Sequence, residues 1–404
     1  MMTKEYPNYA PFTEQTVIEY LKEIGLFAKE EPVSSEEIGD GNLNLVFRVK
    51  NEKTDKSYIA KQALPYAKVV GTSWPLTLDR ARIEYEALKK ENTLLPELTP
   101  TVHYANEELA LTVMDDLSHL VIMRKGLIQG EVYPKVAKDI GTFLAHTLFY
   151  SSDFGMDQQD KKLMASSFTN PELCKITEDL VFTDPFFDHD TNSFPEELRP
   201  YIEDTIWSAS DLKEEVALLK FNFLTKGEAL IHGDLHTGSI FVSPNETKVI
   251  DPEFAFVGPF GFDIGAFIAN LILNYLSQEG HQPDEKQREQ YQNYLLSCIQ
   301  EVWEVFEETF TSLWETNQND VYMTVPAFRK KLLESIFQDA IGFAGCKVIR
   351  RTIGLAHVED IESIQDANVK LTVQKKALAL GKELILTRHQ FQTIDDIVKV
   401  VSQS

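Results

Sequence analysis

The chain has 404 residues, enough for two domains with separate hydrophobic cores. Its formal net charge of −24 argues against a nucleic-acid or anionic-membrane partner, since both require a basic face. An anionic substrate would therefore have to be held by a local cluster of positive charge.

Cysteine usage and hydropathy indicate a protein of a reducing compartment. Cys174, Cys298 and Cys346 are odd in number and lack the spacing of metal ligands, which favours buried, reduced thiols. The residues after Met1 do not form the apolar stretch of a secretory signal, and the apolar segment 267–276 is too short to cross a bilayer. We expect a cytoplasmic protein.

The N-terminal part of the chain is predicted to be rich in strands. A helix is expected over 16–27, where apolar residues recur at helical spacing. Alternating and β-branched residues then predict further elements: strands near 45–49 and 58–63, a helix over 78–90, and strands at 102–104 and 109–114. This order is typical of the small ATP-binding lobe of a kinase.

After residue 117 the pattern becomes mostly helical. Amphipathic periodicity predicts helices over 133–150, 212–224 and 297–314, and only 239–257 interrupts them with strand character. We therefore predict an α+β fold of two lobes with a cleft between them. The small β-rich N-lobe spans 1–116, and the larger, mainly helical C-lobe spans 117–404.

Two acidic loops are the most informative feature of the chain. His232-Gly233-Asp234 is followed 17 residues later by Asp251-Pro252-Glu253 (251 − 234 = 17), with strand-like residues between them. In kinases, one Asp orients the attacking hydroxyl and a later acidic group holds the magnesium that bridges the ATP phosphates. We assign the first role, with acceptance of the hydroxyl proton, to Asp234, and the metal to Asp251 and Glu253. The alternative is a plain turn bent by Pro252, with solvated acids.

Lys61 lies in the middle of a predicted strand and could reach an ATP phosphate. The helix that follows offers Glu84 as the ion-pair partner that would hold it, with Glu86 as the competitor on another face. A solvated strand lysine is the alternative. The two groups together favour a functional role.

Two loops and the exit from the N-lobe are further candidates for ligand contact. Residues 38–44 are glycine-rich and suit close approach of the backbone to phosphates, with Asn44 adding a side-chain contact; a simple hairpin turn is the alternative. Asp115, Asp116 and Leu117 form a hinge whose backbone could pair with adenine. Trp74 lies on a loop that is either a lid or a packed part of the lobe.

Arg350 and Arg351 lie in a largely apolar helix, and a buried arginine requires a partner. Such a cation could hold substrate oxygens or the moving phosphoryl group. Asp263 either caps the next helix or braces the loop of Asp234. Ser239 stands where kinases place a metal-binding Asn, and its hydroxyl is a weaker ligand.

These segments together resemble the 5-methylthioribose kinases, a family within the superfamily of aminoglycoside and choline kinases. The resemblance covers essentially the whole chain and rests on the segments EIGDGNLN, SWPLT, HGDLHTGS, DPEFAF and IRRTIGLAHV. It implies a bilobal, protein-kinase-like fold. It further implies ATP-dependent phosphorylation of 5-methylthio-D-ribose on its C1 hydroxyl in methionine salvage, with magnesium as cofactor and a homodimeric state.

The resemblance also assigns residues to ligands. The nucleotide contacts fall on Asn44, Lys61, Asp115, Asp116, Leu117, Asp251, Pro252 and Glu253. The substrate contacts fall on Asp234, Trp74 and the pair Arg350 and Arg351, of which Arg350 is favoured.

Two alternatives stay open at this point. One is another small-molecule kinase of the same fold, acting on choline, homoserine or an aminoglycoside; polycationic aminoglycosides are disfavoured by an arginine pair in the pocket. The other is a catalytically inactive nucleotide-binding protein. The joint presence of Lys61, Asp234, Asp251 and Glu253 argues against it.

Overall fold

The computed structural model describes residues 6–38, 43–66 and 75–404. The expected lid residue Trp74 and most of the glycine-rich turn, 39–42, lie outside the described residues. The chain divides into two compact units, Met1–Leu120 with Lys248–Phe254, and Val121–Thr247 with Ala255–Ser404. The short segment 248–254, which carries Asp251 and Glu253, thus belongs to the N-terminal unit although it lies far along the chain.

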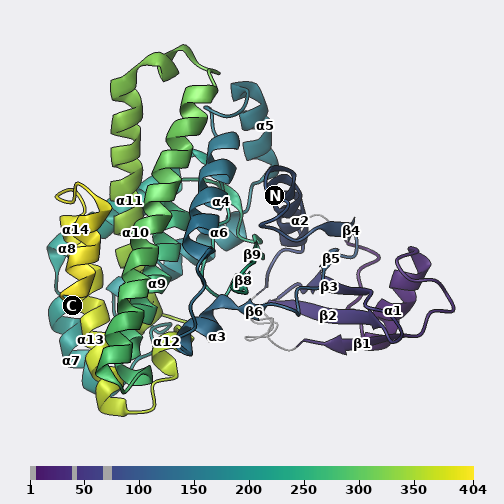
Figure 1. Ribbon diagram of the computed structural model, residues 1–404, viewed down its shortest axis with the longest axis horizontal. Helices are drawn as coiled ribbons and strands as arrows, with labels where there is room; N and C mark the ends of the chain where they lie inside the picture. The colour runs from purple at the N-terminus through teal and green to yellow at the C-terminus, as the bar shows by residue number, and fades with distance from the viewer. Residues whose placement is uncertain (1–5, 39–42, 67–74) are drawn as a thin grey trace. The chain divides into compact units, whose positions relative to one another are not determined.

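The first unit is built on a five-stranded antiparallel sheet, drawn at the right of Figure 1, with the strand order β1-β2-β3-β5-β4. Its elements in chain order are α1 (Glu14–Glu23), β1 (Val33–Glu37), β2 (Asn44–Asn51), β3 (Ser57–Ala63), α2 (Arg80–Leu94), β4 (Val102–Asn106) and β5 (Leu111–Asp115). The predicted strands and helices of this part are confirmed, with boundaries shifted by a few residues.

Alternation along β3 decides which side chains face α1. Ala60 is buried in the core that Val17 and Leu21 of α1 form with Phe47 of β2. Because successive side chains of a strand point to opposite faces, Lys61 points away from this core. The sheet therefore presents Lys61 on its other face.

The second unit is mainly helical, as predicted. Its strands are short: β6 (Val121–Ile122), β7 (Ala229–Ile231), β8 (Ile240–Val242), β9 (Thr247–Val249), which leads into the first unit, and β10 (Phe256–Gly258). Its helices are α3 (Met123–Ile128), α4 (Val136–Tyr150), α5 (Gln158–Ser167), α6 (Pro171–Leu180), α7 (Arg199–Ile202), α8 (Ser210–Thr225), α9 (Gly261–His281), α10 (Glu285–Thr316), α11 (Pro326–Ile353), α12 (Glu359–Glu362), α13 (Ala367–Thr387) and α14 (Ile394–Ser402).

Helix α9 forms the centre of this unit. It is buried almost all round and packs against α10, α11 and α13, as a helix without a polar face must. A Cβ atom on Gly265 would lie 2.3 Å from the backbone oxygen of Ala340, so glycine is required where α9 and α11 cross. This close packing fixes the first turn of α9, which contains Asp263, relative to α11, which carries the arginine pair.

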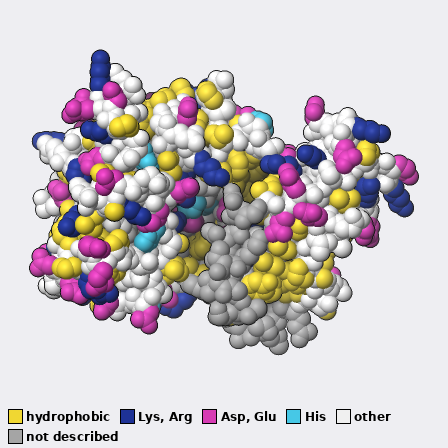
Figure 2. Space-filling view, turned by 90° about the horizontal axis from the view of Figure 1, so that it is seen from below, with side chains coloured by type: hydrophobic (Ala, Val, Ile, Leu, Met, Phe, Trp, Pro, Cys, Tyr) yellow, Lys and Arg dark blue, Asp and Glu magenta, His cyan; other side chains and the backbone are white. Residues whose placement is uncertain are grey.

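The surface and the cysteines agree with the expected chemistry except at one position. Acidic and basic side chains are interspersed over the face shown in Figure 2, rather than gathered into one basic patch. Cys298 and Cys346 are buried free thiols, but Cys174 is partly exposed, so the expectation of burial is wrong for that residue. Among the described residues, every helix is too short or too polar to span a membrane.

Candidate active site

Lys61 forms two ion pairs in the first unit. Its ammonium lies 2.7 Å from Oε1 of Glu84 and also donates to the carboxylate of Asp251. The predicted pairing with Glu84 is confirmed. The competitor Glu86 binds Arg82 instead, at 3.0 Å, because two residues along a helix turn a side chain to another face.

Three carboxylates lie together beside Lys61. One oxygen each from Glu84, Asp251 and Glu253 can be chosen so that all three lie within 4.8 Å of one another. The pKa of Glu84 is raised to about 7. Burial is the largest cause, Lys61 acts to lower the pKa, and Asp251 and Glu253 act to raise it. Burial lowers the pKa of Lys61, but the attraction of the carboxylates outweighs burial and raises it above its usual value. Such a set of hard oxygen donors fits a divalent cation such as Mg²⁺.

The backbone at Asp251 is unusual. Its φ of 71° lies in the left-handed region, which among residues other than glycine is tolerated best by Asn and Asp. The next residue, Pro252, has a fixed φ. The local conformation that presents the Asp251 carboxylate is therefore restricted to very few residue types.

Arg80 was not singled out in the sequence, and it holds this cluster together. Its guanidinium is fully buried and donates to Oε2 of Glu253 at 3.2 Å and to Oδ1 of Asn44 at 3.1 Å. It also binds the backbone oxygens of Leu43, Leu64 and Thr77, at 2.7–2.8 Å. The amide of Asn44 donates to the same Glu253 oxygen at 3.1 Å. Asn44, an expected nucleotide contact, therefore lies beside Glu253.

The hinge carboxylates bind groups of their own sheet. Asp115 accepts from the backbone N–H of Thr101 and from His103, both at 2.7 Å. Asp116 accepts from the hydroxyl of Ser57 at 2.5 Å and lies 3.4 Å from the guanidinium of Arg48. These contacts fix the strand end without involving a ligand, so a hinge role would fall to the backbone.

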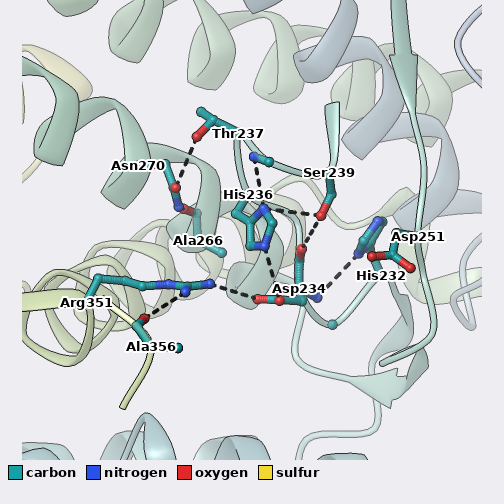
Figure 3. Close-up of polar contacts among 12 residues, drawn as sticks. His232, Asp234, His236, Thr237, Ser239, Asp251, Ala266, Asn270, Arg351 and Ala356 are labelled. Atoms are coloured by element: carbon teal, nitrogen blue, oxygen red, sulfur yellow. Dashed lines mark hydrogen bonds and ion pairs between the residues drawn. The ribbon is translucent and has the colours of Figure 1, made fainter. Parts of the chain in front are cut away.

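In the second unit, the loop of Asp234 follows β7, and hydrogen bonds to Asp263 hold its backbone in place. The Asp263 carboxylate accepts the N–H groups of His232 at 2.6 Å and Gly233 at 3.0 Å. Of its two open readings, the brace is the one observed. Figure 3 shows the next contacts, in which Nδ1 of His232 accepts the N–H of Asp234 at 3.3 Å and the Ser239 hydroxyl donates to the Asp234 carbonyl at 3.3 Å.

The Asp234 side chain lies among basic side chains. Lys347 of α11 donates to its Oδ1 at 3.1 Å. Figure 3 shows the other two contacts: Nε2 of His236 lies 3.4 Å from Oδ2, and the guanidinium of Arg351 lies 4.0 Å from Oδ1. Burial by itself raises the pKa of Asp234, but these groups and Arg350 outweigh it and hold the pKa well below its usual value. The carboxylate is therefore ionised at neutral pH and is poised to accept a hydrogen bond.

The arginine pair is anchored by one carbonyl. Both Arg350 and Arg351 donate to the oxygen of Ala356, at 3.1 and 3.0 Å, and Ala356 itself has a φ of 56°. Arg351 is buried, as expected for this apolar helix, and Arg350 is partly exposed. Arg350 was favoured as the substrate contact, whereas Arg351 is the arginine whose guanidinium lies 4.0 Å from Asp234.

The comparisons with known proteins identify the family. Residues 34–308 match the model of the phosphotransferase enzyme family. A methylthioribose kinase of Geobacillus sp. (strain WCH70) is 54% identical over 98% of this chain and 96% of its own length. One of Geobacillus kaustophilus (strain HTA426) is 52% identical over the full length of both. The chain belongs to the methylthioribose kinase family.

The family membership makes the chain an enzyme that transfers a phosphoryl group to an alcohol. The fold agrees with that of a solved glucosamine kinase, with a TM-score of 0.51 at 12% identity over 91% of this chain and 85% of the other. The resemblance drawn from the sequence is confirmed at the level of family and of fold class.

Sequence reasoning missed two residues of the site, for different reasons. Lys347 lies in the same apolar helix as the arginine pair, so the signal that singled out Arg350 and Arg351, a charge among buried residues, applies to it equally. Arg80 carries no such signal. It opens an amphipathic helix two residues before Arg82, and the sequence does not show which of the two is buried.

Proposed function

We propose that this enzyme uses ATP to phosphorylate the C1 hydroxyl of 5-methylthio-D-ribose, giving 5-methylthioribose 1-phosphate for methionine salvage. The substrate assignment is supported by 54% identity over 98% of the chain with a relative named methylthioribose kinase. The chemistry is supported by an ionised, partly exposed carboxylate beside cations in one unit and a lysine–carboxylate cluster in the other.

Asp234 is the group proposed to act on the sugar. Its carboxylate orients the C1 hydroxyl and accepts the proton as the hydroxyl oxygen bonds to the γ-phosphorus and the bond to the β,γ-bridging oxygen breaks, so that ADP leaves. Arg350 and Arg351 bind sugar or phosphoryl oxygens, and Trp74 closes over the sugar. Charge that develops on the transferred group is thereby stabilised by fixed cations.

The nucleotide is proposed to be bound by the first unit. Lys61 pairs with ATP phosphate oxygens, the backbone of Asp115, Asp116 and Leu117 pairs with adenine, and Asn44 and the Asp251-Pro252-Glu253 loop complete the contacts. Asp251 and Glu253 would hold Mg²⁺, which when bound neutralises phosphate charge. Glu84 serves chiefly to hold Lys61, with which it is already paired at 2.7 Å.

An ADP-release assay across four acceptors tests the substrate. We expect kcat/KM for methylthioribose to be at least about a hundredfold higher than for ribose, choline or homoserine. The poorer acceptors would not make all the contacts that the binding site offers to methylthioribose. The position of transfer is read from the product. Phosphorylation at C1 removes the hemiacetal, so the product should no longer be a reducing sugar; a reducing product would contradict transfer to C1.

Asp234→Asn tests the mechanism. We expect a loss of about 10³-fold or more in kcat with the fold retained, since the amide neither carries the charge nor accepts the proton. Near-normal turnover would remove Asp234 from the reaction. A homodimeric state is also proposed, on the family resemblance, and light scattering of the purified protein tests it. A cytoplasmic location is proposed on the cysteine usage and hydropathy of the sequence.

A further inference from the structure

Lys347 is a buried lysine in the most apolar part of α11. Its side chain is 6% exposed, and the residues that follow it, Val348 and Ile349, are fully buried. Removing an ammonium group from water costs several kcal/mol unless other charges compensate for it. A lysine at this position therefore depends on the groups that it meets.

The contacts of Lys347 converge on Asp234. Its Nζ donates to Oδ1 of Asp234 at 3.1 Å and lies 4.8 Å from the ring centroid of Phe262 in α9. The aromatic face supports the cation from one side while the carboxylate pairs with it from another. The ammonium is thus held at one place by three neighbouring elements: α11, α9 and the loop after β7.

The other titratable groups near this pair are engaged elsewhere or lie farther away, except that Nε2 of His236 lies 3.4 Å from Oδ2 of Asp234. They are His232 and His236 of the loop, Arg350 and Arg351 of α11, Arg124 of α3, Asp263 of α9 and Asp360 of α12. Asp263 accepts two loop N–H groups, and Asp360 accepts from Asn274 at 2.7 Å. The pKa of His236 is lowered well below its usual value, chiefly by burial, so its ring is neutral at neutral pH.

Lys347 and the arginine pair differ in what they can do for Asp234. The lysine makes a direct hydrogen bond to the carboxylate, whereas Arg351 lies 4.0 Å away and directs a donor to the carbonyl of Ala356. The arginine pair is therefore placed to bind a ligand beside Asp234, and the lysine is placed to bind Asp234 itself.

We propose that Lys347 is a positioning residue that fixes the orientation and the ionised state of Asp234, so that the sugar hydroxyl meets a carboxylate and not a carboxylic acid. The proposal rests on the assignment of Asp234 as the residue that accepts from the hydroxyl. A protonated Asp234 would offer a donor where an acceptor is needed, and it could not take the proton.

The charge of Lys347 has a measurable consequence for pH dependence. An opposite charge within about 4–6 Å lowers the pKa of a carboxyl by roughly 1–3 units, and burial acts in the other direction. Without the ammonium, burial is opposed only by His236, at 3.4 Å, and by the more distant arginines. The pKa of Asp234 should then rise, and the acid limb of the pH–rate profile should move to higher pH.

The test compares pH profiles of kcat/KM for methylthioribose, at saturating MgATP, in four full-length variants. Lys347→Met and Lys347→Gln should each move the acid limb upward by about one pH unit or more, and should lower kcat at neutral pH by about tenfold. Lys347→Arg keeps a cation and should keep the limb within about 0.3 pH units. The matched control is Lys330→Met in the same helix, since Lys330 is 80% exposed, and its profile should equal that of the wild type.

Folded Met and Gln variants whose acid limb coincides with the wild type would overturn the proposal. If both neutral variants fail to fold, the proposal requires that Asp234→Asn in the same chain restores folding, because the uncompensated charge is then removed; a double variant that stays unfolded also overturns it. Failure of the proposed mechanism is distinguished by the single variant Asp234→Asn. If that variant is active, Asp234 has no catalytic role, and if it is inactive while the limb of Lys347→Met is unshifted, only the role of Lys347 fails.

Discussion

The buried guanidinium of Arg80 donates to the Glu253 carboxylate at 3.2 Å, across 173 residues of sequence. The same guanidinium binds Asn44, Leu43, Leu64 and Thr77. One side chain thus joins a proposed metal ligand to the end of the glycine-rich turn, to a backbone carbonyl just after β3 and to one just before α2. All of these groups belong to the first unit.

Arg80→Met should destabilise the protein strongly. It leaves the buried Glu253 carboxylate without its cation and three backbone oxygens without their donor, and breaking a buried ion pair in this way costs about 3–5 kcal/mol. Arg80→Lys should recover only part of this loss, because an ammonium cannot reproduce the planar fork of donors. The free energy of unfolding from urea titration measures both.

Arg82→Met is the matched control for Arg80. Arg82 lies two residues along the same helix, and its pairs with Asp79 and Glu86 are partly exposed. Its loss should cost no more than about 1 kcal/mol. Equal effects at the two positions would contradict the role of Arg80.

Glu84→Gln should impair the use of ATP. Without its charge, Lys61 keeps Asp251 as its ion-pair partner and is no longer held from the α2 side. We expect kcat/KM for ATP to fall by about 10²-fold, as is typical for loss of a group that positions a phosphate-binding cation. Glu86→Gln, which alters the pair with Arg82 and leaves the pair of Lys61 with Glu84 in place, should stay within about twofold. Similar losses in both variants would mean that Lys61 does not depend on Glu84.

Asp251→Asn should weaken the affinity for magnesium. Asn tolerates the left-handed backbone of position 251, so the substitution removes a charge and a hard oxygen donor without adding strain. The magnesium concentration at half-maximal thermal stabilisation, in the presence of a non-hydrolysable ATP analogue, should rise about tenfold or more. Asp55→Asn, in the exposed turn between β2 and β3, should leave it unchanged. A normal magnesium requirement in Asp251→Asn would exclude Asp251 as a ligand.

Asp234 should contribute to stability in a pH-dependent way. Its pKa in the folded protein is depressed well below that of an unfolded Asp, which is about 3.9. The contribution is therefore fully present above the unfolded pKa and is lost as pH falls through the folded pKa. The difference in unfolding free energy between the wild type and Asp234→Asn should be constant from about pH 8 to 5 and should shrink below about pH 4. A difference that grows on acidification would contradict the depressed pKa.

Local signals in the sequence were sufficient for β2, β3, β4 and β5 of the first unit but not for β1, for the helical character of the second unit, and for the pairing of Lys61 with Glu84. The prediction of this pairing rests on helical periodicity, which places Glu84 and Glu86 on different faces of α2. Residue chemistry alone also singled out the two acidic loops.

The sequence by itself determined the family and the residue types of the site, because those depend on short segments whose meaning is local. It did not determine that Arg80 and Lys347 complete the two clusters. Whether a charged side chain is buried, and against which carboxylate, depends on residues brought together from distant parts of the chain, as with Lys347 and Asp234, 113 positions apart. Burial and pairing are properties of the packed molecule, and only the tertiary structure decided them.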